Sequence, residues 1–211
     1  MTTHLLIKPL LRLNEFIAKA VDVLAIRENE GIHPKHYLTK YSDFFVTNIT
    51  TNDRVLDIGC GNGYIASRLA EKALAVTGID FNLERITFAQ KQFSRDNLQF
   101  ITGDATAYAY KENYDALVLS NVLEHIENRL DFLLRIKKLA PKLLIRVPMI
   151  NRDWVVLYKK DLGLPYMSDA THYIEYTIES FADEMKSAGL RIDSYSIQFG
   201  EIWAVVTKER P

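Results

Sequence analysis

The stretch that decides the fold class of this 211-residue chain is Arg54-Val55-Leu56-Asp57-Ile58-Gly59-Cys60-Gly61-Asn62-Gly63. Its first half is a short apolar run that predicts a buried strand, and its second half is a glycine-rich turn. Residues 65–72 then predict a helix. Glycine lets a backbone turn tightly with positive φ and approach a ligand closely. The stretch therefore predicts a ligand-binding loop at the carboxyl end of a strand, where open α/β sheets bind their ligands.

Downstream of this unit, strand and helix patterns alternate, which implies βαβ crossovers and a mainly parallel sheet. The end of the chain differs, because only two residues connect its last two strands and so short a connection demands an antiparallel hairpin. The predicted fold class is α/β, a doubly wound, mainly parallel sheet with an antiparallel C-terminal hairpin strand. The further strands are expected at residues 74–80, 98–103, 115–120, 143–147, 191–198 and 201–208, and the further helices at 83–93, 122–139 and 178–188.

An N-terminal helical cap precedes the first strand. One helix is expected from Pro9, which suits a first-turn position, to Arg27; a second is expected at residues 35–48, where i,i+4 spacing would pair His36 with Lys40 and Tyr37 with Tyr41. We expect a single domain over residues 1–211. Its parts are the cap (1–49), a ligand-binding core (50–147), an insertion (148–177) and a C-terminal helix and hairpin (178–211).

Composition and charge exclude several functional classes. A formal net charge of −1 shows none of the basic excess of a general nucleic-acid binder, so no nucleic-acid partner is expected. Cys60 is the only cysteine, which excludes an intramolecular disulfide and argues against a cysteine-based zinc site. The first residues lack a signal-peptide pattern, and no apolar run reaches the roughly 20 residues that span a bilayer. A cytoplasmic location without a transmembrane segment is expected.

Two residues beside the glycine loop argue against a dinucleotide. A dinucleotide fingerprint needs Gly or Ala at position 64, where this chain has Tyr64. A pyrophosphate prefers a bare helix N-terminus, yet the acidic Asp57 lies just before the loop. An acid at this place suits a ligand that carries an ammonium group.

Residues 55–63 resemble the first motif of class I S-adenosyl-L-methionine-dependent methyltransferases. Further segments that resemble this family follow in its order: Gly78-Ile79-Asp80, Gly103-Asp104-Ala105, and Tyr114-Asp115 leading into Leu119-Ser120-Asn121-Val122-Leu123-Glu124-His125. The resemblance covers residues 50–147 in detail and the rest in outline. It implies a Rossmann-like methyltransferase fold, S-adenosyl-L-methionine as cofactor and S-adenosyl-L-homocysteine as product.

The resemblance also implies roles for individual residues around the cofactor. Asp57 would lie near the ammonium group and Asp80 would accept hydrogen bonds from both ribose hydroxyls. Phe81 would lie against the adenine, Asp104 would accept from its amino group, and the Ala105 amide would donate to its ring. The loop that would wrap the methionyl moiety is Gly59, Cys60, Gly61, Asn62 and Gly63, and the residues that would face the methionyl side and the acceptor are Ser120 and Asn121. In the alternative interpretation, Asp80 and Asp104 cap turns and Phe81 fills the core.

His125 is the candidate catalytic base. It is expected in the first turns of the helix after the fourth strand, where the helix dipole disfavours an imidazolium. In the alternative interpretation this histidine packs against the sheet. Glu124-His125 with His172 also resembles RNA-terminal methyltransferases, which bind a divalent metal through Glu-x-x-Glu-His. Here Asn121 replaces the first glutamate, so no metal site is expected.

The acceptor is expected to be a small molecule. Candidate acceptor residues come from the insertion and from the cap, where the family folds a lid over the cofactor; they are Arg152, Trp154, His172, His36, Tyr37 and Tyr41. The helix at residues 9–27 could pack on the core, join a homodimer or rest on a membrane, and its mixed charges favour the first two. The expected activity is methylation of a sugar, lipid or quinone-like precursor. The alternatives are a non-catalytic module that binds S-adenosylmethionine or S-adenosylhomocysteine, and an RNA or protein methyltransferase.

Overall fold

The computed structural model describes residues 3–110 and 112–209, with side chains from residue 6 onward. The outermost residues of the expected cap and of the expected C-terminal part (1–2 and 210–211) lie outside this description. The division of the chain into a single domain with four parts stays a prediction.

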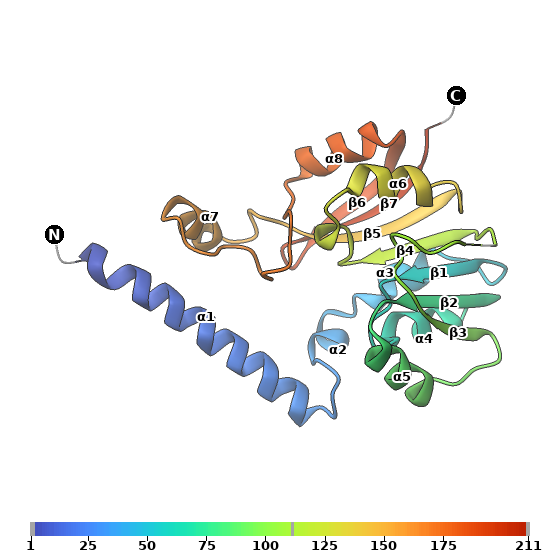
Figure 1. Ribbon diagram of the computed structural model, residues 1–211, viewed down its shortest axis with the longest axis horizontal. Coiled ribbons are helices and arrows are strands. Elements are labelled where there is room, and N and C mark those ends of the chain that lie inside the picture. Colours follow the sequence, from blue (N-terminus) through green and yellow to red (C-terminus); the bar gives the residue numbers. More distant parts are fainter. Residues whose placement is uncertain (1–2, 111, 210–211) are drawn as a thin grey trace.

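Seven strands form one sheet in the order β3-β2-β1-β4-β5-β7-β6 (Figure 1). Strands β1 to β5 pair in parallel, and β7 pairs antiparallel with both β5 and β6. The predicted fold class and hairpin are confirmed. The strands are β1 (Arg54–Ile58), β2 (Ala75–Asp80), β3 (Leu98–Thr102), β4 (Ala116–Ser120), β5 (Lys142–Pro148), β6 (Leu190–Gln198) and β7 (Glu201–Lys208).

Helices cover both faces of the sheet, and their buried side chains form two core clusters. On one face Phe132 of α6 and Phe181 of α8 pack against the strands; on the other, Phe45 of α3 and Leu69 of α4 do so. The helices are α1 (Thr3–Glu28), α2 (Lys35–Thr39), α3 (Ser42–Thr47), α4 (Tyr64–Ala70), α5 (Leu83–Gln92), the 3-10 turn η1 (Leu123–His125), α6 (Arg129–Ile136), α7 (Trp154–Asp161) and α8 (Ile178–Ser187).

The sheet also positions the functional site. Because β2 follows β1 on one side and β4 lies on the other, the chain reverses its direction of progress between β1 and β4. The loops that follow these strands diverge there and leave the crevice in which α/β proteins bind ligands. The glycine-rich loop follows β1 at this point.

The N-terminal helices differ from the prediction. The expected helix at 35–48 is divided, because Lys40 takes a left-handed conformation (φ 49°). This turn allows Tyr41 to bury its ring in the core cluster that contains Phe45 and Trp203, so the predicted pairs of His36 with Lys40 and of Tyr37 with Tyr41 on one helix are wrong. The first helix begins earlier than expected, and Pro9 lies inside it rather than in its first turn.

The expected helix at 122–139 is also interrupted. Ile126 is extended (φ −103°, ψ 122°) and buries its side chain, which separates η1 from α6. His125 therefore lies in a single 3-10 turn, and the prediction that it lies in the first turns of a long helix is wrong. Among the described residues, no helix is long and apolar enough to cross a membrane. The cytoplasmic location stays a prediction.

Candidate active site

The glycine loop after β1 is shaped by left-handed backbone. Gly59 has φ 68°, and a Cβ on it would lie 2.7 Å from Cγ2 of Val122, so close packing requires glycine there. Gly61 has φ 55°, and a Cβ on it would meet no atom of the protein within 4 Å. The loop is therefore packed against Val122, just after β4, at Gly59 and is open at Gly61.

Asp57 lies at the base of this loop, near the end of β1, and is 1% exposed. Its Oδ2 has no hydrogen-bond partner among the described residues. Burial and the nearby Asp80 carboxylate raise the pKa of Asp57 to about 8, opposed by the backbone N–H of Ala66. A buried carboxylate without a partner is costly. A cationic group bound in the crevice would remove this cost, so Asp57 fits the ammonium of a methionyl ligand.

Asp80 ends β2 beside the loop, and both of its carboxylate oxygens already accept backbone N–H groups. Oδ2 accepts from Gly61 at 2.9 Å and Oδ1 accepts from Asn82 at 2.8 Å. The carboxylate thus ties the glycine loop to β2 while each oxygen keeps further acceptor capacity. Phe81 follows with 75% of its surface exposed, so the interpretation of this ring as core is wrong.

Asp104 has the contacts of a turn-capping residue. Its Oδ1 accepts from the backbone N–H of Thr106 at 2.8 Å and from the Thr106 hydroxyl at 2.7 Å. These bonds hold the pKa of Asp104 below its ordinary value. The carbonyl of Ala105 accepts from the Arg135 guanidinium. Capping does not exclude adenine binding at this loop, which stays a prediction.

At the end of β4, Ser120 and Asn121 contact an ion pair that the sequence analysis did not identify. Asn121 has a left-handed backbone (φ 56°) and donates from Nδ2 to Oε1 of Glu201 at 3.3 Å. Ser120 Oγ accepts from Nη1 of Arg146 at 3.3 Å. The signal in the sequence was Arg146, a single arginine inside the otherwise apolar run 143–148, but its partner Glu201 comes from β7, across the antiparallel register.

Of the three candidate acceptor residues in the cap, His36 and Tyr41 lie near Tyr64, the first residue after the glycine loop. The Tyr41 hydroxyl pairs with Nδ1 of His36, and the His36 ring lies 4.4 Å from the ring of Tyr64. Burial, with the positive charges of Lys35, His33 and Arg146, lowers the pKa of His36 to about 4. Tyr37 is exposed, and the structure does not bring it to this group.

On the acceptor side, Glu124, His125 and His172 come together, with one potential ligand atom of each within 4.8 Å of the others. Glu124 is 0% exposed, and neither of its carboxylate oxygens has a hydrogen-bond partner among the described residues. Burial raises the pKa of Glu124 to about 7, opposed by its own backbone, by Asn121 and by His172. The two imidazole rings lie 4.6 Å apart.

Both histidines of this cluster are oriented through Nδ1. Nδ1 of His125 lies 2.8 Å from the Thr171 hydroxyl, and Nδ1 of His172 lies 3.2 Å from Oε1 of the buried Glu175. Each Nε2 is left for a ligand, as in metal-binding histidines that a second carboxylate or hydroxyl orients. Burial and the neighbouring His172 lower the pKa of His125. Its lowered pKa therefore comes from these contacts and not from a helix dipole.

The other two candidate acceptor residues of the insertion, Arg152 and Trp154, make polar or ring contacts within the insertion itself. Arg152 pairs with Glu175 and donates to the Met149 carbonyl at 2.8 Å, contacts that hold the insertion together. Trp154 is 71% exposed on α7 and stacks on Tyr158, with ring centroids 6.0 Å apart. Trp154 is therefore a surface residue, and acceptor roles for both residues stay predictions.

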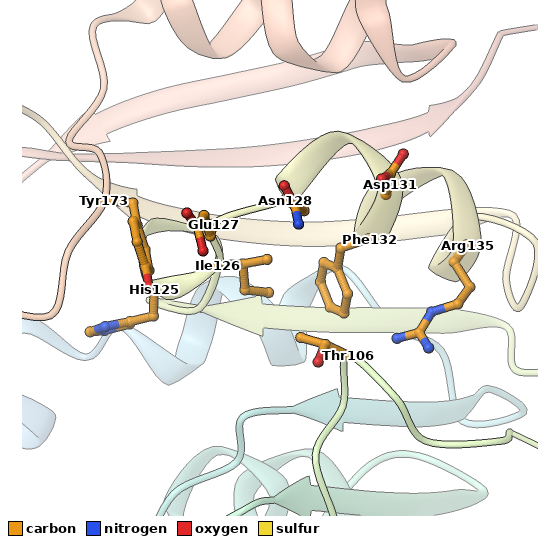
Figure 2. Close-up of a pocket in the computed structure, with 9 residues that line it drawn as sticks. All are labelled: Thr106, His125, Ile126, Glu127, Asn128, Asp131, Phe132, Arg135 and Tyr173. Carbon is orange, nitrogen blue, oxygen red and sulfur yellow. The ribbon is translucent and has the colours of Figure 1, made fainter.

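A cavity of about 440 Å³ adjoins the cluster. Figure 2 shows His125 and Tyr173 at one end of it and Arg135 at the other, with Thr106 and Phe132 between them. Thr106 follows Asp104 and Ala105, so the cavity runs from the predicted adenine side to the His125 side.

Comparisons with known proteins agree with this architecture. A family model described as "Methyltransferase domain" matches residues 21–195. A protein named Ubiquinone biosynthesis O-methyltransferase, from Rickettsia bellii (strain OSU 85-389), is 31% identical over 101 residues, which cover 46% of this chain and 42% of that protein. The match thus spans less than half the length of that curated relative.

Solved structures show the same fold at low identity. A chain in the complex of the Haloferax volcanii Trm112 methyltransferase activator with a methyltransferase has a TM-score of 0.70 and 16% identity, covering 90% of this chain and 96% of that chain. Magnesium protoporphyrin IX methyltransferase from Synechocystis PCC 6803, with bound S-adenosylhomocysteine, has a TM-score of 0.66 and 18% identity, covering 83% of each chain. Since the family model matches well over half of its length, this chain belongs to the methyltransferase-domain family of class I S-adenosylmethionine-dependent methyltransferases.

Proposed function

We propose that this protein transfers a methyl group from S-adenosyl-L-methionine to a small-molecule acceptor and releases S-adenosyl-L-homocysteine. The observation that carries the proposal is the buried carboxyl group of Asp57, at the base of the open glycine loop. Its Oδ2 has no hydrogen-bond partner in the part of the chain that the structure describes. A nicotinamide dinucleotide offers no ammonium to this carboxylate and would bring its pyrophosphate close to it. An S-adenosylmethionine ammonium satisfies it.

The residues around the loop divide the work of holding the cofactor. Asp57 binds the ammonium, and Gly61 leaves the space through which the methionyl backbone passes. Asp80 binds the ribose hydroxyls with the acceptor capacity that its two backbone contacts leave. Phe81, Asp104 and Ala105 hold the adenine. Ser120 and Asn121 face the methionyl end, where the Arg146–Glu201 ion pair orients them.

The cofactor, when bound, supplies an already activated methyl group for in-line displacement. The protein's tasks are then to align the acceptor and exclude water. The cap suits the second task, since His36 and Tyr41 close over Tyr64 at the edge of the loop. His125, kept neutral by its lowered pKa, would accept the proton of an acceptor hydroxyl.

The acceptor is proposed to be a metabolite with a hydroxyl group, such as a quinone-like precursor, a sugar or a lipid. Support comes from the insertion, which places polar side chains at the carboxyl end of β4 and β5, and from the printed name of the Rickettsia bellii relative. The net charge of −1 gives no support to a nucleic-acid acceptor.

A second candidate function is methyl transfer assisted by a divalent cation. The observation that favours it is Glu124, a fully buried carboxylate next to two oriented imidazoles; neither of its oxygens has a partner in hydrogen-bonding geometry among the described residues. One carboxylate and two imidazoles suit a divalent transition metal. Such an ion would bind the acceptor oxygen and lower its pKa, so that His125 would act as a ligand rather than a base.

The experiment that tests the main proposal is thermal unfolding with S-adenosylhomocysteine, with NAD as the control ligand. A ligand at a hundred times its Kd adds about 2.7 kcal/mol, which corresponds to a shift of roughly 5–10 °C for a chain of this size. We expect the shift with S-adenosylhomocysteine alone. A shift with NAD alone, or with neither ligand, contradicts the proposal.

A further inference from the structure

The long helix α1 makes few contacts with the rest of the described chain. It has 26 residues, which span about 39 Å, and it extends away from the sheet in Figure 1. No other described helix or strand packs along it. Its polar contacts with later segments run through Glu15, whose Oε2 lies 3.4 Å from Nζ of Lys159 on α7, and Asp22, whose Oδ1 lies 3.3 Å from Nε2 of His33.

The opposite face of α1 carries an apolar stripe, which we call the heptad stripe. Its exposed members are between 52% and 63% accessible, and Ala20 completes the spacing. Alternate steps of four and three residues are the spacing of a coiled-coil seam. The exposed members are Leu6, Leu10, Leu13, Ile17 and Leu24.

The direction of the stripe follows from helix geometry. At about 100° per residue, the heptad stripe lies on the side of α1 opposite Glu15 and Asp22. Those two side chains contact α7 and the turn after α1, so the stripe faces away from the rest of the molecule. In a surface helix of a globular protein the apolar stripe usually faces the core. In α1 the polar face lies toward the rest of the molecule and the apolar face lies outward.

We propose that the heptad stripe pairs with the same stripe of a second copy of this chain, in antiparallel orientation. With the two-fold axis beside residue 15, Leu6 packs against Leu24 of the other copy, Leu10 against Ala20 and Leu13 against Ile17. Every layer then joins two apolar residues. A parallel pair would align the two helix dipoles and gather Lys8 and Arg12 of both copies at one end, which the antiparallel pair avoids.

Surface area and charge favour a second copy over a lipid surface. Stable protein interfaces bury roughly 800 Å² on each partner, which requires a continuous set of large exposed side chains. The exposed stripe with its flanking residues Phe16, Val21 and Val23 supplies such a set, since each of these side chains is 48–70% exposed. Helices that rest on anionic membranes carry a cationic surplus on the polar face. Here Lys8, Arg12 and Lys19 are nearly balanced by Glu15 and Asp22.

Sedimentation velocity of the full chain tests the proposal. We expect the wild-type chain to have twice the mass of one chain and the double variant Leu13→Asp/Ile17→Asp to have the mass of one chain. The control Arg12→Asp, on the polar face, is expected to remain dimeric. Circular dichroism verifies that each variant is folded. A monomeric wild type, or a double variant that stays dimeric, overturns the proposal. A monomeric wild type that binds phosphatidylglycerol vesicles would assign the stripe to lipid instead.

Disulfide cross-linking gives a test that needs no disruptive substitution. In the antiparallel pair Leu6 lies beside Leu24 of the other copy, whereas the two Leu6 residues lie at opposite ends. We therefore expect the double variant Leu6→Cys/Leu24→Cys to form a cross-linked dimer on mild oxidation and the single variant Leu6→Cys to remain uncross-linked; the native Cys60 is buried. Cross-linking of Leu6→Cys alone would overturn the antiparallel arrangement.

Discussion

Arg146 and Glu201 form a two-pronged ion pair between β5 and β7, with Nε 2.6 Å from Oε2 and Nη2 2.8 Å from Oε1. The guanidinium also lies over the Tyr41 ring, 4.2 Å from its centroid. Glu201 in turn accepts from Asn121. One ion pair thus joins the helical cap, the antiparallel strand and the end of β4, so the acceptor side of the site depends on residues from three separate parts of the chain.

Replacement of Glu201 by Gln leaves the Arg146 guanidinium mostly buried without a countercharge. Breaking a buried pair on one side typically costs about 3–5 kcal/mol, and we expect the low end because Glu201 is partly exposed. The measurement is urea unfolding. The matched control is Arg191→Met, in a pair where the arginine is 53% exposed; we expect its effect to stay below about 1 kcal/mol. Equal effects of the two variants would contradict the buried role of Arg146.

The Asp57→Asn variant should separate ligand binding from apoprotein stability. Loss of a charged hydrogen bond of about 1.5–3 kcal/mol weakens S-adenosylhomocysteine binding by roughly 10–100-fold in calorimetry. The ligand-free variant should nevertheless be more stable than the wild type at neutral pH, because the introduced amide does not have to take up a proton when the chain folds, as the Asp57 carboxyl does. A variant that binds as tightly as the wild type would contradict the ammonium contact.

The same carboxyl predicts how apoprotein stability depends on pH. The folded pKa of Asp57, about 8, is raised above its unfolded value near 3.9. The folded state therefore binds this proton more tightly, and its contribution to stability is lost as pH rises from about 4 through about 8. Urea unfolding across this range should show a steeper decline for the wild type than for Asp57→Asn. Parallel curves would be the contrary result.

His36 should produce the opposite slope at acidic pH. Its folded pKa, about 4, is lowered below the ordinary value near 6.5. Between these values the unfolded state binds more protons, so the free energy of unfolding falls as pH falls from about 6.5 to about 4. The His36→Phe variant has no imidazole to protonate at this position. Its free energy of unfolding should therefore depend less on pH over that range. An unchanged slope would mean that His36 is charged in the folded protein.

Calorimetric titration with Mn²⁺ or Zn²⁺ alone distinguishes the two roles proposed for His125. If the cluster binds a cation, Glu124→Gln and His172→Ala each abolish the binding signal, and a chelator removes methyl transfer. If His125 acts as a base, chelation has no effect and His125→Ala lowers kcat by about 10²–10⁴-fold. The control is Asp131→Asn, since Asp131 lines the same cavity but lies outside the cluster. This variant should change neither the calorimetric binding signal nor kcat. Activity that survives both chelation and His125→Ala would contradict both roles.

Local sequence pattern determined most of the sheet. The apolar run 54–58, the glycine loop after it and the two-residue turn before β7 each carry their signal within a few neighbouring residues. Strand existence, parallel pairing and the C-terminal hairpin were therefore predictable, and β1 and β7 have the predicted bounds. The placement of Asp57 and Asp80 at adjacent strand ends follows from the same logic, since parallel strands present their carboxyl ends at one edge.

Tertiary contacts decided what local pattern could not. The helix expected at 35–48 divides at Lys40 because burial of Tyr41 outweighs helix propensity, and His125 leaves the expected helix because Ile126 turns into the core. The meeting of Glu124 with His172, and of Arg146 with Glu201, joins residues about fifty positions apart. Such pairs form only when the sheet closes and the insertion folds across it, since their attraction is short-ranged and carries no periodic trace in the sequence.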